Sequence, residues 1–167
     1  GFKHELTLSA LKTLTLFYQT KGDFIQMQPL MEELLSLQTD MLGEKHPETL
    51  TCLYNLAGLY KNQNDYVRAE LFMKKCLNLR KEVLGVRHPD SLKSLHNLSL
   101  LYSYQGEYDE AKCLLEECLS LYCQVYGERS ANTILIVKNL AAIYHIEGDY
   151  NEGTNLLRLH GLTSILS

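Results

Sequence analysis

The fold is decided by residues 46–88, which read HPETLTCLYNLAGLYKNQNDYVRAELFMKKCLNLRKEVLGVRH. This stretch contains two amphipathic segments separated by the polar run 61–65. In the first segment apolar side chains recur at the spacing of one helix face. They are Leu50, Leu53, Leu56, Ala57 and Tyr60. The second segment carries a similar stripe and stops at Gly85, a residue type that commonly terminates helices. The stretch therefore predicts a helical hairpin.

This hairpin is one unit of a repeat with a period of 42 residues. Histidines near the start, tyrosines in the first segment and glycines at the end of the units keep this spacing. They are His4, His46 and His88; Tyr18, Tyr60, Tyr102 and Tyr144; and Gly43, Gly85 and Gly127. One hairpin cannot bury both its faces, whereas stacked hairpins can. The sequence therefore predicts an all-α fold, an α-solenoid of four stacked helix-turn-helix repeats in a single array over residues 1–167. The predicted repeats span about 4–45, 46–87, 88–129 and 130–167.

Composition narrows the class of protein. A hydrophobic fraction of 46% in 167 residues supports a packed core, and a net charge of −4 argues against a nucleic-acid partner. No apolar run is long enough to cross a membrane, so we expect no membrane insertion. Five cysteines without a CxxC pair indicate free thiols in a reducing compartment, hence a cytoplasmic protein without a metal site. No catalytic or phosphate-binding motif is present, which predicts a protein that is not an enzyme and needs no cofactor.

Two patterns carry a resemblance to a known family. Within the hairpin stands Asn55-Leu56-Ala57-x-x-Tyr60, followed by Asp65-Tyr66-x-x-Ala69. Between hairpins stands Leu84-Gly85-x-x-His88-Pro89. The first pattern resembles the tetratricopeptide repeat, and the second, with the long period, resembles its kinesin light chain class. The resemblance covers essentially the whole chain. It implies a right-handed superhelix in which the first helix of each hairpin lines a concave, protein-binding groove.

The outer repeats depart from this pattern. Pro29 falls early in the second helix of the first repeat, where we expect a shifted start or a kink. In the last repeat Gly153 replaces the usual alanine, and His160 and Gly161 interrupt the second helix. Terminal repeats are often atypical because they cap the stack. We expect the apolar tail 162–167 to pack on the last hairpin or on a following repeat.

The first helices present a polar stripe opposite their buried one, and we predict that this stripe binds a peptide. Its candidate residues are Lys12, Tyr54, Asn55, Lys61, Lys93, His96, Asn97, Tyr104, Lys138, Asn139 and His145. Asn55, Asn97 and Asn139 are in register, although asparagine is a mediocre helix former. The resemblance implies that these amides hold an extended peptide, and the alternative is a hydrogen bond between neighbouring helices.

The lysines of this stripe, with His96 and His145 nearby, predict a basic groove in an acidic protein. Such a groove would select and steer an acidic peptide. The alternative is that scattered lysines only keep this face soluble. Other recurring residues are interpreted as structural, namely His46 and His88 at the inter-repeat turns, the core residues Cys76 and Cys118, and the tyrosines of the first helices.

The leading hypothesis is therefore a non-catalytic protein-interaction module, an adaptor or scaffold that binds an extended, acidic segment of a partner protein. The alternative is a structural or sensor segment of a larger signalling protein that associates with itself. The apolar tail that follows Gly161 motivates this second hypothesis.

Overall fold

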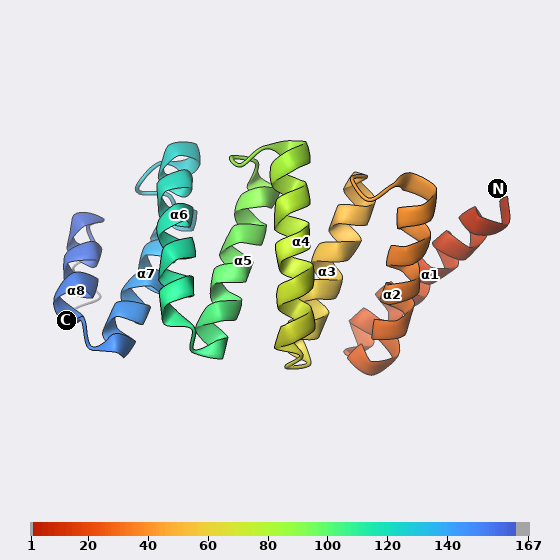
Figure 1. Cartoon of the computed structure of the whole chain (residues 1–167), viewed down its shortest axis with the longest axis horizontal. Coiled ribbons are helices and arrows are strands. Elements are labelled where there is room, and N and C mark those ends of the chain that lie inside the picture. Colours follow the sequence, from red (N-terminus) through yellow and green to blue (C-terminus); the bar gives the residue numbers. More distant parts are fainter. Residues whose placement is uncertain (1, 163–167) are drawn as a thin grey trace. The chain divides into compact units, whose positions relative to one another are not determined.

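The computed structural model describes residues 2–162, and within them the chain forms eight α-helices joined by short turns (Figure 1). The helices are α1 (Phe2–Lys21), α2 (Phe24–Leu42), α3 (Pro47–Asn62), α4 (Tyr66–Leu84), α5 (Pro89–Gln105), α6 (Tyr108–Tyr126), α7 (Ala131–Glu147) and α8 (Tyr150–Leu159). Each odd-numbered helix and its successor form one of the hairpins that the 42-residue period predicts. The predicted all-α repeat solenoid is thereby confirmed.

The chain divides into two compact units, Gly1–Gly85 and Val86–Ser167. Unit 1 contains α1 to α4, and unit 2 contains α5 to α8. Inside each unit every helix packs against its neighbours in the chain, so that the second hairpin covers the side of the first. A single array that continues through both units stays a prediction.

The repeating residues at the turns cap the helices. His46 precedes α3 and accepts a hydrogen bond at Nδ1 from the backbone N–H of Glu48, with 3.3 Å between the two nitrogens. His88 does the same before α5. Each is followed by a proline at the first helical position, where the missing N–H leaves no bond unmade. Both histidines are therefore structural, as predicted.

Pro29 does not shift the start of α2. Asp23 caps α2 by accepting from the N–H of Gln26, and Asp65, 42 residues later, caps α4 in the same way. The predicted shift is therefore wrong. Pro29 withdraws only the N–H that would meet the carbonyl of Ile25. Ile25 itself is 79% exposed. A kink at this proline stays a prediction.

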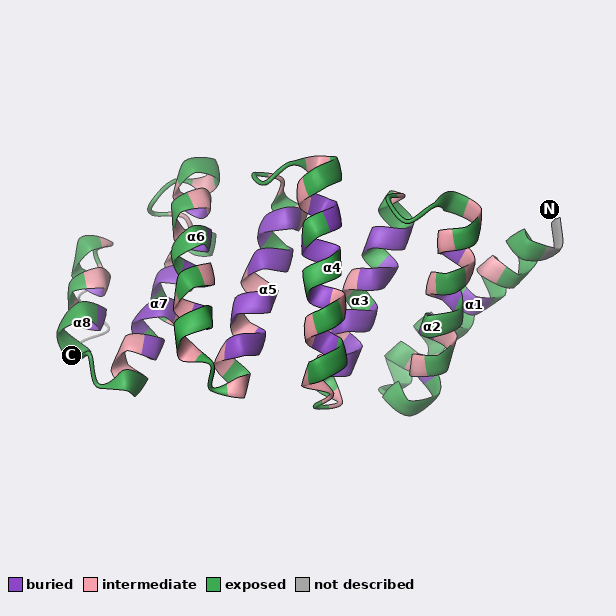
Figure 2. Cartoon of the chain, in the orientation of Figure 1, coloured by how far each residue is buried: buried purple, intermediate pink, exposed green. Residues whose placement is uncertain are grey.

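Buried residues line the sides of the helices that face their neighbours (Figure 2). Ala57, Ala69 and Ala111, small residues that recur in register, are fully buried. In unit 2, α8 ends at Leu159, where the sequence predicts an interruption. Leu162 packs against the core cluster of Val137, Ala141 and Leu157. The rest of the predicted apolar tail lies outside the described residues.

Candidate functional site

The predicted peptide-binding residues all lie on the first helices of the hairpins, α1 and α3 in unit 1 and α5 and α7 in unit 2. The exposed ones are Lys12, Asn55, Lys93, Tyr104 and Lys138. The half-buried ones are Tyr54, Lys61, His96, Asn97, Asn139 and His145. The predicted residues thus fall into two groups: the exposed ones face solvent, and the half-buried ones also pack within their own unit.

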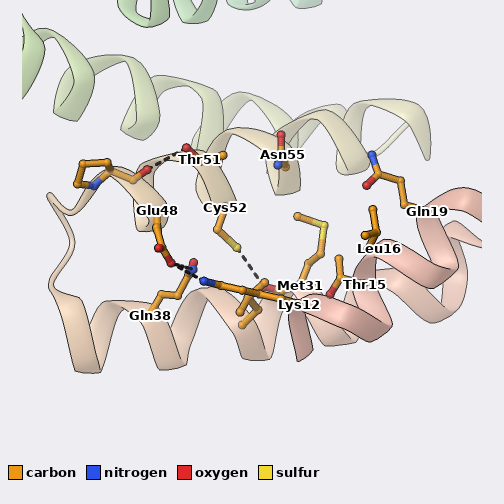
Figure 3. A pocket seen from close by; sticks show the side chains of 12 residues that line it. Lys12, Thr15, Leu16, Gln19, Met31, Gln38, Glu48, Thr51, Cys52 and Asn55 are labelled. Atoms are coloured by element: carbon orange, nitrogen blue, oxygen red, sulfur yellow. Dashed lines mark hydrogen bonds and ion pairs between the residues drawn. The ribbon is translucent and has the colours of Figure 1, made fainter. Parts of the chain in front are cut away.

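Unit 1 contains a pocket of about 360 Å³ between α1, α2 and α3 (Figure 3). It brings together two of the predicted residues, Lys12 of α1 and Asn55 of α3. Its other walls mix apolar and polar side chains. They are Thr15, Leu16, Gln19, Met31, Leu34, Gln38, Pro47, Glu48, Thr51 and Cys52. This volume lies at the lower end of the range for ligand-binding pockets, roughly 300–1,000 Å³.

An ion pair spans one end of this pocket. The Lys12 ammonium extends from α1 to Glu48 at the start of α3, with 2.5 Å between Nζ and Oε2 (Figure 3). The hydrogen bond and the charge of Lys12 lower the pKa of Glu48. The charge that the sequence assigns to a basic groove is thus compensated here. Glu48 is a site residue that the sequence interpretation missed, because a first-turn glutamate is also what a helix dipole favours.

Gln38 lies beside this ion pair and is only 2% exposed. Its Nε2 lies 3.4 Å from the Glu48 carboxylate, to which it donates, whereas its Oε1 is buried and has no hydrogen-bond partner among the described residues. An unsatisfied buried acceptor is costly, typically about 1–3 kcal/mol. Gln38 therefore gives the pocket wall an amide oxygen that a donor could satisfy. Its signal in the sequence is a polar residue on the buried face of α2.

The three asparagines in register do not share one role. Asn139 of α7 is hydrogen-bonded to His96 of α5, with 2.8 Å between Nδ2 and Nε2. This is the bond between neighbouring helices that the sequence leaves open as an alternative. Asn55 is exposed on the pocket rim, and its amide makes no side-chain hydrogen bond to any other described residue. Asn55 is therefore the member of the series whose amide is available to a ligand.

The two predicted histidines pack inside unit 2. His96 is half-buried with its ring edge-on to Tyr122, and burial lowers its pKa. Burial therefore disfavours a positive charge on His96 in the folded chain. His145 shares a hydrogen bond with the Ala141 carbonyl at 2.7 Å and lies against Tyr150. A Cβ on Gly153 would come within 2.6 Å of the His145 ring, which explains why glycine replaces alanine there.

The remaining stripe residues also differ in their surroundings. Tyr54 packs on the core of unit 1, and the Arg80 guanidinium lies 4.5 Å from the centre of its ring. Lys93 and Lys138 are exposed and form no ion pair with another residue in the described part of the chain. The uncompensated positive charge on this stripe therefore includes two lysines of unit 2.

The pocket of unit 1 holds a thiol that is not activated. Burial raises the pKa of Cys52 to about 12, and its Sγ lies 3.8 Å from the Met31 carbonyl oxygen. A nucleophilic cysteine needs a lowered pKa. Across residues 2–162 no cluster of three or more His, Cys, Asp or Glu side chains could hold a metal ion. No described helix combines the length and apolar character needed to cross a membrane.

Comparisons with known proteins agree with this architecture. Two models of the tetratricopeptide repeat match the chain, over residues 49–90 and 72–124. No curated protein sequence matches it.

Solved structures resemble the fold over nearly the whole chain. A putative kinesin light chain repeat protein from Podosopora anserina has a TM-score of 0.80 at 23% identity, covering 94% of this chain and 75% of that one. BtubC (BKLC) from P. vanneervenii has a TM-score of 0.83 at 19% identity, covering 98% and 65%. The apo form of RapI has a TM-score of 0.76 at 16% identity, covering 95% and 56%. At such identities the likeness shows a shared fold.

Proposed function

The chain is a tetratricopeptide repeat protein whose hairpins fold like those of the kinesin light chain type, and from that premise we propose that it binds an extended segment of a partner protein. Its exposed first-helix surfaces form the binding face. The module is non-catalytic and acts as an adaptor or scaffold in the cytoplasm. The single observation that carries this proposal is the pocket of unit 1, where Lys12 and Asn55 lie together.

The contents of that pocket suit a peptide. The exposed Asn55 amide can both donate to and accept from a peptide backbone. The buried Oε1 of Gln38 can accept a further N–H, and Leu16 and Met31 offer apolar contact to a side chain. These groups together would hold one residue of the partner and orient the backbone on either side of it.

The preference for an acidic partner rests mainly on unit 2. Lys12 is paired with Glu48, so the pocket itself contributes little net charge. Lys93 on α5 and Lys138 on α7 are exposed and unpaired with other described residues. Lysines placed in this way raise the association rate of an acidic segment. Salt screens this attraction, so the effect becomes smaller as the salt concentration increases.

The test is a titration of fluorescent peptides of matched length, one rich in glutamate and one rich in lysine. We expect Asn55→Ala to weaken binding of the acidic peptide about tenfold, roughly 1.4 kcal/mol. We expect the double variant Lys93→Glu, Lys138→Glu to weaken the acidic peptide and favour the basic one. Salt should weaken the wild-type complex.

The control for each single substitution, Lys93→Glu or Lys138→Glu, is Arg87→Glu, which reverses one charge at an exposed residue in the turn before α5. It should leave the affinity for the acidic peptide within about twofold. Equal binding of both peptides by the wild type, or equal losses from Arg87→Glu and the lysine variants, would remove the case for an acidic partner. Unchanged binding by Asn55→Ala would remove the case for the pocket.

A second candidate function, self-association, is favoured by one observation on α1. Leu6, Leu14 and Phe17 lie on one face of this helix and are 56%, 44% and 48% exposed. An apolar stripe of this kind suits contact with another protein surface. Light scattering over a range of concentrations tests it. A mass that rises with concentration in the wild type but stays constant in Leu14→Lys would support it, and a constant monomer mass would exclude it.

A further inference from the structure

Because 84 is twice the repeat period, residues 84 positions apart are equivalent in the two units. One set of three equivalent residues carries a different charge in unit 2 than in unit 1. In unit 1 the set is Glu32, Tyr60 and Arg68. In unit 2 it is Glu116, Tyr144 and Glu152. Both sets take their residues from the second helix of one hairpin and from both helices of the next. Only the third position changes, from a cation to an anion.

In unit 1 the three side chains form a closed arrangement. The Tyr60 hydroxyl donates to Glu32, with 2.7 Å between the two oxygens. The Arg68 guanidinium lies over the Tyr60 ring, 4.6 Å from its centre, and its Nη1 is 3.9 Å from the same Glu32 oxygen. The Phe72 ring also packs against the Tyr60 ring, with 5.3 Å between their centres, and Tyr60 is only 2% exposed. The cation thus both neutralises Glu32 and covers the aromatic ring.

In unit 2 the same place is open. Tyr144 still donates to Glu116, at 3.3 Å, but among the described residues no guanidinium covers its ring. Leu156 stands where unit 1 has Phe72, and a smaller side chain there leaves space. The result is a pocket of about 370 Å³ between α6, α7 and α8. Glu116, Tyr144 and Glu152 all line it, and Leu119, Leu140 and Leu156 supply apolar walls.

Among the described residues, neither Glu116 nor Glu152 forms an ion pair with a cation. Burial, followed by the charge and the hydrogen bond of Glu116, raises the pKa of Tyr144; the charge of Lys112 opposes this, and Glu152 adds a smaller rise. The Nζ of Lys112 lies 5.9 Å from the centre of the Tyr144 ring. That ammonium is held by two other carboxylates, at 2.7 Å from Glu147 and 3.1 Å from Asp109. Arg68 is also paired with Asp65, but it reaches Glu32 as well, whereas Lys112 forms no ion pair with Glu116 among the described residues.

We propose that the pocket between α6, α7 and α8 binds an arginine side chain of a partner protein, in the place that Arg68 occupies in unit 1. The guanidinium lies over the Tyr144 ring and between the carboxylates of Glu116 and Glu152. Arginine fits better than lysine because a planar guanidinium can stack on a ring and meet a carboxylate at the same time. The aliphatic part of the side chain contacts the leucines. This site is separate from the peptide-binding pocket and does not depend on it.

The experiment compares three blocked tripeptides that differ only in their central residue: arginine, lysine or citrulline, the neutral isostere of arginine. Binding is followed through the amide signals of the ¹⁵N-labelled full chain. We expect the arginine peptide to shift signals of residues around Tyr144, Glu152 and Leu156. We expect it to bind at least about threefold tighter than the lysine peptide and tenfold tighter than the citrulline peptide. Equal affinities for arginine and citrulline would overturn the proposal.

Two variants place the effect in the pocket. Glu116→Gln should weaken the arginine peptide about tenfold, whereas Glu110→Gln, the same change on an exposed residue of α6 outside the pocket, should not. Glu152→Arg rebuilds the unit 1 set, so the chain should stay folded by its amide spectrum and lose arginine binding. Wild-type affinity in Glu152→Arg would overturn the proposal.

A second copy of this chain could also supply an arginine. Light scattering distinguishes that source, because the proposal expects a mass that does not change between the wild type and Glu152→Arg. A concentration-dependent mass that this substitution abolishes would assign the arginine to a second copy and overturn the assignment to a different partner.

Discussion

In the orientation that the structure shows, the hydrogen bond from Asn139 Nδ2 to His96 Nε2 requires a neutral histidine. The Asn139 amide can donate to Nε2 of His96 if the ring carries its proton on Nδ1. Protonation would turn Nε2 into a donor that faces another donor. Burial already lowers the pKa of His96, so the folded protein resists this protonation. The bond is therefore a pH-dependent link between the two hairpins of unit 2.

This link predicts how stability changes with pH. Above the pKa of an unfolded histidine, near 6.5, His96 is neutral in both states and its contribution is complete. As the pH falls through that value, the unfolded chain takes up the proton first, so the folded state loses stability. We therefore expect His96 to lower the free energy of unfolding as the pH falls below about 6.5. Urea unfolding at about pH 7.5 and pH 5.5 measures it.

The control is His96→Gln, which keeps an acceptor for Asn139 but cannot titrate. Its free energy of unfolding should change less than that of the wild type between the two pH values, because the other histidines are common to both proteins. An identical pH dependence in the two proteins would show that His96 is not protonated more readily on unfolding.

Single residues also show where sequence patterns lose their power. Tyr54 and His145 belong to the polar stripe by helical spacing, yet both rings pack within their own unit. A ring is long enough to cover an adjacent helix, and the pattern along one helix does not record what that helix meets. Gln38 joins the pocket of unit 1 for the same reason, because its neighbours Lys12 and Glu48 come from two other helices.

Whole helices were far easier to predict. The 42-residue period places α3 and α4 within a few residues of their observed ends, because the capping residues repeat with the period. Pro47 starts α3, Asp65 caps α4 and Gly85 ends it. The period also gives the observed start of α2, because Asp23 caps it as Asp65 caps α4; the shift expected from Pro29 was the error.

Pro29 makes α2 less stable than it could be. It lies in the interior of the helix, where a proline removes one backbone hydrogen bond. Alanine would restore that bond, and in a helix interior it is about 3 kcal/mol more favourable than proline. The greater entropy of the unfolded chain with alanine offsets part of this gain. We therefore expect Pro29→Ala to stabilise the protein by roughly 2 kcal/mol in urea unfolding.

The equivalent position of α4 is Leu71, which is 65% exposed and so packs little. Leu71→Ala should be nearly neutral, within about 0.5 kcal/mol, and Leu71→Pro should destabilise by an amount similar to the gain from Pro29→Ala. If Pro29→Ala instead destabilised the protein, the proline would have a favourable role in the fold.

At the scale of the whole chain, two hairpins form each compact unit, and equivalent residues of the units are 84 positions apart. In repeat proteins stability is roughly a sum of terms within repeats and between neighbours. A cavity inside one unit should therefore loosen that unit more than the other. Leu56, 0% exposed, lies in the core of unit 1, and Leu140, its equivalent in unit 2, is 2% exposed.

Hydrogen exchange followed by mass spectrometry measures this directly. Leu56→Ala should cost about 2–5 kcal/mol and speed exchange throughout α1 to α4, while the amides of α5 to α8 keep most of their protection. Leu140→Ala is the matched control and should show the reverse pattern, because it removes the same group from the same register. Equal loss of protection in both units by either variant would mean that the chain unfolds as one cooperative body.

In that case a partner bound to the unit 1 pocket would stabilise the arginine pocket of unit 2 as well, whereas separate unfolding would leave the two sites energetically independent.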